Sequence, residues 1–189
     1  MLVHFRKTAA RRYAVLVERE RSAALVAHPA PGYDEYLPHD LLHFVAEAEW
    51  GLNGAVFGQL AAGRDPGIFL PVERELVRQW VRRRKLRPKA HPKGRRSELL
   101  AFALQSAWNA RRHRRPLPDG WDDLLAEARV DAERLARVVG SLDEVAERWH
   151  NLRIGEELTL EWPRAERRPV PHGPLHLQKR GRRLRRRSR

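Results

Sequence analysis

The composition of the chain changes abruptly after Pro163, and this boundary limits where a folded core can lie. Residues 164–189 contain eleven Lys and Arg residues against one acidic residue, with few apolar side chains. A segment of this composition cannot bury enough apolar surface to offset the conformational entropy lost on folding. We therefore predict a disordered, arginine-rich tail over 164–189 and a single globular domain over 1–163, which is long enough to form a hydrophobic core.

Within 1–163, the order of apolar patterns predicts an α+β fold. Residues 2–7 and 12–18 are rich in β-formers on either side of a short polar break, which is typical of a β-hairpin. Residues 23–27 are a third candidate strand. Residues 158–162 alternate and end at a proline, so we expect them to pair with the hairpin. The result is a small antiparallel sheet packed against a mainly helical domain.

The chain between these strands carries helical periodicity that prolines and glycines interrupt. Predicted helices span 38–52, 55–62, 72–84, 97–113, 121–128, 131–139 and 142–150. Ser97 is the expected N-cap of its helix, and Ser141 begins an expected capping box after Gly140. No run of eighteen apolar residues occurs, so the sequence predicts no membrane span and favours a cytoplasmic location.

The net charge of +14 is concentrated in two segments. The tail alone carries +10, and nine of the fifteen residues over 82–96 are basic while none is acidic. Clustered cations release counterions when they meet a polyanion. The charge therefore predicts a binding protein for nucleic acid or the ribosome, with an acidic protein as another partner that it fits. The residues expected to contact phosphates are Arg82, Arg83, Arg84, Lys85, Lys179, Arg180, Arg182, Arg183, Arg185, Arg186 and Arg187.

The same arginines have a second explanation. Arginine outnumbers lysine 33 to 5, and the chain is rich in Ala, Gly and Pro, a combination typical of GC-rich coding bias. Arginines that accumulated on a tolerant surface would have no dedicated partner, so charge alone leaves both explanations open.

One predicted helix carries a polar stripe with the spacing of metal ligands. His39, His43 and Glu47 recur every four residues and therefore project from one side of the helix. Two histidines at i and i+4 can bind one metal ion. The chain has no cysteine, so any metal must use His and carboxylate ligands. We expect at most one divalent ion, zinc, manganese or iron. Candidates for a further ligand are His150, His113 and Glu49.

The stripe also has a catalytic interpretation. His39-Asp40-x-x-His43 is a near relative of the H-E-x-x-H helix of zinc peptidases, with Asp40 in the place of the general base. Asp is one methylene shorter than Glu, so it reaches a metal-bound water less easily. The alternative function is thus a metal-dependent hydrolase or another metalloprotein. Metal-free acid–base chemistry and a solvated face of interacting charges remain further alternatives, as does a helical domain that docks another protein.

Residues 37–47 (LPHDLLHFVAE) and 56–63 (VFGQLAAG) resemble a family of bacterial cytoplasmic proteins without an established activity. A ubiquinone-biosynthesis scaffold family also carries an H-D-x-x-H element, but the Glu found twelve residues later in that family is Ala55 here. The first resemblance implies a bacterial, cytoplasmic source and no particular reaction.

Overall fold

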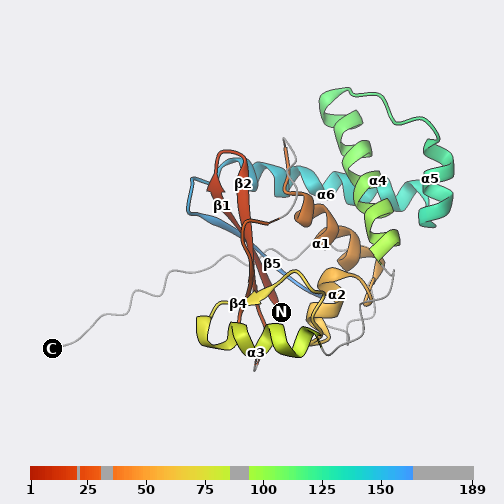
Figure 1. The fold of residues 1–189 in the computed structure, drawn as a ribbon. Helices are drawn as coiled ribbons and strands as arrows, with labels where there is room; N and C mark the ends of the chain where they lie inside the picture. Colours follow the sequence, from red (N-terminus) through yellow and green to blue (C-terminus); the bar gives the residue numbers. More distant parts are fainter. Residues whose placement is uncertain (21, 31–35, 86–93, 164–189) are drawn as a thin grey trace.

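The computed structural model describes residues 1–20, 22–30, 36–85 and 94–163 (Figure 1). The predicted tail over 164–189 lies outside these residues, with every site residue expected in it. Residues 86–93, the middle of the second basic segment, also lie outside them.

Five antiparallel strands form one sheet in the order β4-β3-β2-β1-β5. The strands are β1 (Leu2–Ala9), β2 (Arg12–Glu18), β3 (Leu25–Ala27), β4 (Leu70–Pro71) and β5 (Glu157–Glu161). Phe5 lies opposite Val15 in the hairpin, and Val3 lies opposite Leu160 of β5. The predicted hairpin and its pairing with the late strand are therefore confirmed. The sequence did not predict β4, since two residues are too short to show an alternating pattern.

Six helices accompany the sheet among the described residues. They are α1 (His39–Trp50), α2 (Val56–Ala61), α3 (Arg74–Lys85), α4 (Gly94–His113), α5 (Trp121–Ala128) and α6 (Ala132–His150). Figure 1 shows α1 between the sheet and α4, with α6 running behind them. No helix in the described part of the chain is long and apolar enough to cross a membrane.

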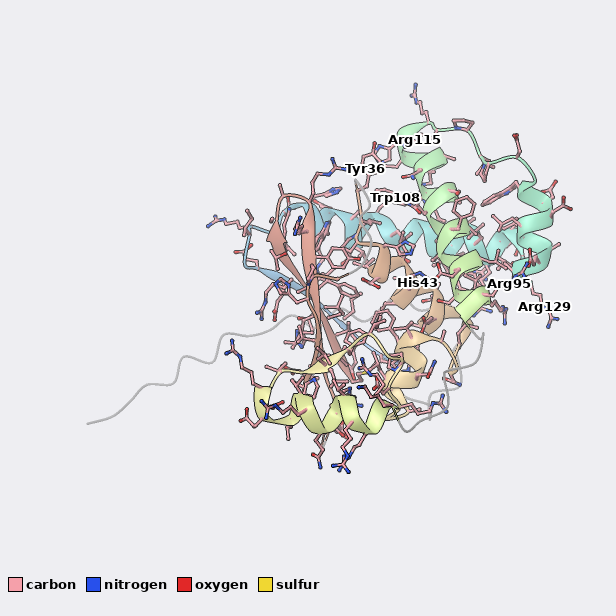
Figure 2. The ribbon with its side chains drawn as sticks, in the orientation of Figure 1. Tyr36, His43, Arg95, Trp108, Arg115 and Arg129 are labelled. Carbon is pink, nitrogen blue, oxygen red and sulfur yellow. The ribbon has the colours of Figure 1, made fainter. Side chains whose placement is uncertain are left out.

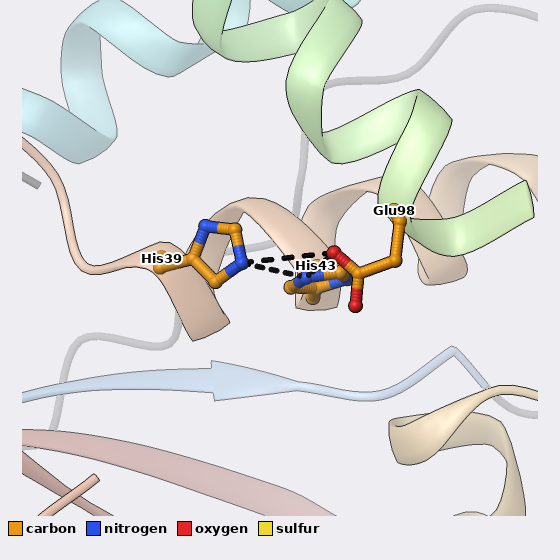
Figure 3. Close-up of side chains that lie close together, drawn as sticks. All are labelled: His39, His43 and Glu98. Atoms are coloured by element: carbon orange, nitrogen blue, oxygen red, sulfur yellow. Dashed lines mark hydrogen bonds and ion pairs between the residues drawn. The ribbon is translucent and has the colours of Figure 1, made fainter. Parts of the chain in front are cut away.

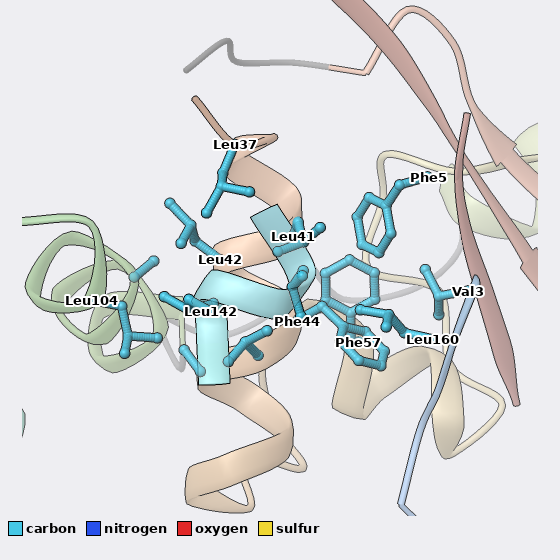
Figure 4. Packing of buried hydrophobic residues seen from close by; sticks show 14 of the residues in the cluster. Val3, Phe5, Leu37, Leu41, Leu42, Phe44, Phe57, Leu104, Leu142 and Leu160 are labelled. Atoms are coloured by element: carbon cyan, nitrogen blue, oxygen red, sulfur yellow. The ribbon is translucent and has the colours of Figure 1, made fainter. Parts of the chain in front are cut away.

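The hydrophobic core surrounds α1 (Figure 4). On the sheet side, Phe44 of α1 packs edge-on against Phe5 and Phe57, with ring centroids 6.2 and 5.3 Å apart. On the other side lie Leu104 of α4 and Leu142 of α6, both fully buried. Because apolar neighbours cover both sides of α1, every side chain from 40 to 47 is buried. The alternative that the polar stripe is a solvated helix face is therefore wrong, because His39 is the one member of the stripe that is partly exposed.

Two predicted helix boundaries are also wrong. Helix α4 begins at Gly94, so Ser97 is a buried residue of its first turn and not its N-cap. Helix α6 continues through Gly140 and Ser141, whose hydroxyl donates to the Val138 carbonyl at 2.8 Å. Tertiary packing overrides the local capping signal here, because α6 buries one continuous apolar stripe on both sides of this point.

Candidate metal centre

The packing of α4 on α1 brings two histidines and a glutamate together at the surface (Figure 3). Nε2 of His43 lies 3.0 Å from Nε2 of His39 and 3.3 Å from Oε2 of Glu98. Nε2 of His39 lies 3.8 Å from the same Glu98 oxygen. His43 is buried, while His39 and Glu98 are 37% and 66% exposed. His43 therefore fixes the group to the core, while His39 and Glu98 are accessible to solvent.

Ser97 holds the second nitrogen of the buried histidine. Its Oγ lies 2.8 Å from Nδ1 of His43 and 3.0 Å from Oε1 of Glu47. Ser97 and Glu98 are neighbours in α4, so one turn of that helix supplies both the residue that supports His43 and the third member of the group, its carboxylate. The three buried side chains form a continuous chain from His43 through Ser97 to Glu47.

Glu47 is fully buried and is satisfied by the start of α2. Its carboxylate accepts hydrogen bonds from the N–H groups of Val56, Phe57 and Gly58 at 3.1, 2.7 and 3.1 Å. Added to the Ser97 hydroxyl, these bonds give the carboxylate four donors. Burial raises the pKa of Glu47, and these hydrogen bonds lower it. Burial has the larger effect, so the pKa of Glu47 is raised to about 7.

This arrangement differs from the predicted set of metal ligands. Sequence spacing placed Glu47 beside His39 and His43, but the group within ligand distance contains Glu98 in its stead. Glu47 lies one helical turn beyond His43, where it binds the α2 backbone. Gly58 is required there, since a Cβ atom on it would lie 2.2 Å from the Leu52 carbonyl oxygen.

The hydrogen bonds around His43 favour one tautomer of its neutral ring. Above its pKa of about 7, Glu47 is ionised and only accepts, so Ser97 donates its single proton to Glu47 and accepts from His43. Nδ1 of His43 is then the protonated nitrogen of the neutral ring, and the lone pair of its Nε2 faces His39, which lies at hydrogen-bond distance, and Glu98. Burial also lowers the pKa of His43, which favours the neutral ring that a metal ion needs.

Asp40, the predicted general base, is engaged elsewhere. Its Oδ2 accepts the Tyr13 hydroxyl proton at 2.7 Å, and its backbone N–H donates to the same hydroxyl oxygen at 3.2 Å. Burial raises the pKa of Asp40, and the Tyr13 bond opposes that shift. Asp40 therefore fastens the first turn of α1 to β2 of the sheet.

The other candidate ligands lie apart from the group. Nε2 of His150 lies 2.7 Å from the Tyr36 carbonyl oxygen, and His113 stacks on the Tyr36 ring at 3.8 Å. Glu49 is not among the grouped ligand atoms in the described part of the chain.

The predicted phosphate-contacting residues of α3 have two different environments. Arg82, Arg83 and Lys85 are exposed. Arg84 pairs with Asp65 at 2.9 Å and donates to the Phe69 carbonyl, so it fastens α3 to the loop before β4.

No family model, curated protein or solved structure matches this chain. The interpretation of the site therefore depends on its own geometry. Sequence reasoning missed Glu98 because it lies 55 residues after His43 and only tertiary packing brings it there. The local signal that could have identified it is the polar pair Ser97-Glu98, which immediately precedes a largely apolar stretch of α4.

Proposed function

We propose that this protein binds one divalent metal ion, with zinc as the best fit, through Nε2 of His39, Nε2 of His43 and the carboxylate of Glu98. The observation that carries the proposal is the size of the triangle of donor atoms, with sides of 3.0, 3.3 and 3.8 Å. Tetrahedral zinc with ligand bonds of about 2.0–2.1 Å has donor atoms about 3.3 Å apart. The two ligands that are partly exposed, His39 and Glu98, have room to move and equalise the sides.

The surroundings of His43 support the same proposal. Metal-ligating histidines usually donate their other ring N–H to an acceptor that fixes the tautomer. The chain from Nδ1 of His43 through Ser97 to Glu47 supplies such an acceptor, inside the core and with all partners buried. These contacts favour a histidine that is prepared for a metal ion over a histidine that merely fills space.

Three protein ligands at a solvent-accessible surface leave a coordination position for water or a substrate. Two histidines and one glutamate are the ligand set of several hydrolytic zinc enzymes, in which the bound ion lowers the pKa of water and polarises a carbonyl or phosphoryl oxygen. We assign the centre to this hydrolytic class. Asp40 is not assigned the role of general base, because its side chain is buried and its Oδ2 accepts the Tyr13 hydroxyl proton.

The test is the metal content of the full chain purified without a histidine tag. The wild type is expected to hold about one divalent ion per chain, and the His39→Ala/His43→Ala variant none. Glu98→Gln provides a second variant at a 66% exposed position, where a loss of folding is not expected. Wild-type protein that contains no metal and does not take up added zinc, manganese or iron would remove this function.

Binding of nucleic acid is a second candidate function, favoured by the exposed cations in the last turn of α3. Arg82, Arg83 and Lys85 face solvent, whereas Arg84 is committed to Asp65. We propose these three residues, together with the basic residues of 164–189, as a phosphate-contacting surface. Its affinity is expected to fall steeply with salt, since fixed cations gain by displacing counterions.

A further inference from the structure

A pocket of about 480 Å³ opens where the N-terminal turns of α4 face the loop after α1. Its apolar lining includes Leu52 and Leu99, and its cationic lining consists of Arg95, Arg96 and Arg129 (Figure 2 labels Arg95 and Arg129). This volume is within the range of about 300–1,000 Å³ that small-molecule sites occupy. The pocket thus combines an apolar wall with three guanidinium groups.

We propose that this pocket binds the phosphate group of a small organic phosphate. Guanidinium groups recognise phosphate through paired N–H donors, and several of them around one cavity favour a group with more than one negative charge. One acidic side chain, Glu127, also lines the pocket and pairs with Arg95. Three cations against one anion leave a net positive charge for the ligand.

The backbone conformation of Arg129 provides an independent argument that its side chain has a role in the pocket. Arg129 follows α5 with φ 54° and ψ 57°, a left-handed conformation that L-residues rarely adopt. The N–H of Arg129 bonds to the Ala126 carbonyl and the N–H of Val130 bonds to the Leu125 carbonyl, which is the Schellman ending of a helix. Glycine is the usual residue at this position, so the chain places an arginine where its backbone is disfavoured.

The other two arginines differ in how much of their hydrogen-bonding capacity is used. Arg96 donates from Nε to the Ala128 carbonyl at 3.0 Å and from a terminal nitrogen to the Arg129 carbonyl at 3.5 Å. These bonds tie α4 to the end of α5 and keep the guanidinium at the pocket wall. Within the described part of the chain, the Arg129 side chain has no hydrogen bond or ion pair, so it is the group with most donors to offer.

The pocket and the candidate metal centre are neighbours along α4. Arg95 precedes Glu98 by three residues, which places them on one helix face and about 4.5 Å apart along the axis. We infer that the pocket anchors the phosphate of the substrate on which the metal centre acts. This inference about the substrate rests on the proposed function, whereas binding of phosphate by the pocket does not.

The test uses adenosine monophosphate as the probe and adenosine as the uncharged comparison, titrated calorimetrically into the full chain at physiological ionic strength. Arg129→Gly removes the guanidinium and suits the left-handed backbone, so this variant is expected to fold at least as well as the wild type. Arg112→Ala removes an exposed arginine at the end of α4 farthest from the pocket and serves as the matched control for net charge. The measurements are repeated on His39→Ala/His43→Ala.

We expect the nucleotide to bind wild type, Arg112→Ala and the histidine variant alike, and to bind Arg129→Gly about tenfold more weakly or worse. Adenosine should bind none of them measurably. Equal nucleotide affinity in Arg129→Gly and wild type, or no binding to either, would overturn the pocket. Binding that disappears only in the histidine variant would place the phosphate on the metal, which refutes the pocket and leaves the proposed function standing.

Nucleotide binding by a protein that takes up no metal would support the phosphate pocket and refute the proposed metal centre. Acetate or citrate that competes as well as inorganic phosphate would show a general anion site and contradict the assignment to phosphate.

Discussion

The hydroxyl oxygen of Ser97 lies 2.8 Å from Nδ1 of His43, inside the core and on the side of the imidazole that faces away from His39. This contact links a surface group of donor atoms to a buried carboxylate, Glu47. It also makes the protonation of a ring nitrogen depend on a residue that is not itself a ligand.

Ser97→Ala should weaken zinc binding although all three ligands stay in place. Without the hydroxyl, Nδ1 of His43 loses its acceptor and the ring loses its fixed tautomer, which typically costs about 10–100-fold in metal affinity. Competition with a chelator of known affinity measures the effect. Ser106→Ala, a half-buried serine in the same helix, is the control and should bind zinc as the wild type does. Equal affinities of wild type and Ser97→Ala would show that the contact has no part in binding.

The pH dependence of stability should report on Glu47. Burial raises the pKa of Glu47 from 4.5 to about 7, so the native state binds more protons than the unfolded state between these values. This residue's stabilisation is therefore fully present below about pH 4.5 and is lost as the pH rises to about 7.

The measurement is urea unfolding of metal-free protein at several pH values. His43 contributes with the opposite sign. Burial lowers its pKa, so its stabilisation is present above the unfolded value of about 6.5 and is lost as the pH falls from there through the lower folded value. The comparison of wild type with Glu47→Gln separates the two, as only Glu47 is removed. The stability advantage of the wild type should shrink between pH 4.5 and 7, and an advantage that grows over this range would contradict the account.

Two helical glycines should respond to alanine in opposite directions. Gly58→Ala places a Cβ atom 2.2 Å from the Leu52 carbonyl oxygen and 2.6 Å from Cα of Asn53, both backbone atoms, so we expect a loss of about 1–3 kcal/mol or more. Gly140→Ala meets only a nitrogen of Arg111 at 3.5 Å, and should stabilise α6 by about 0.5–1 kcal/mol. Thermal unfolding compares them. A neutral Gly58→Ala would show that the loop before α2 is not held where Glu47 binds it.

The basic surface predicts different outcomes for neighbouring arginines. The triple variant Arg82→Ser/Arg83→Ser/Lys85→Ser should bind duplex and single-stranded nucleic acid more weakly with unchanged stability. Its slope of log K against log salt should become shallower by about 0.7–0.9 for each phosphate that the variant no longer neutralises. Arg84→Ser should instead lower stability, because Asp65 loses its partner. Deletion of 164–189 should reduce binding further, and indistinguishable affinities of the full and shortened chains near physiological salt would refute the nucleic-acid surface.

The parts of the fold that could be predicted from the sequence are those that depend on local patterns of residues. The hairpin, the pairing of the late strand and the extent of α5 were predicted, because each depends on residues close in sequence or on one alternating pattern. The split of α6 was wrong because a Gly-Ser pair carries a local stop signal that the buried stripe on both sides outweighs.

The residues of the candidate site follow the same rule: local contacts could be predicted from the sequence and tertiary contacts could not. His39 and His43 were identified from their spacing of four residues, which a helix alone converts into proximity. Glu47 shares that spacing, yet the N–H groups of Val56, Phe57 and Gly58 bind its carboxylate, and no pattern within α1 could reveal them. Glu98 could be placed only with the packing of α4 on α1.

The most direct test of the metal centre is anomalous diffraction at the zinc absorption edge, on crystals of the full chain prepared with one equivalent of zinc. We predict a single strong peak about 2.0–2.1 Å from Nε2 of His39, from Nε2 of His43 and from a carboxylate oxygen of Glu98. His43 should keep its Nδ1 contact with Ser97 in that structure. A map without a peak between these three residues, or with zinc bound only elsewhere on the chain, would contradict the proposal.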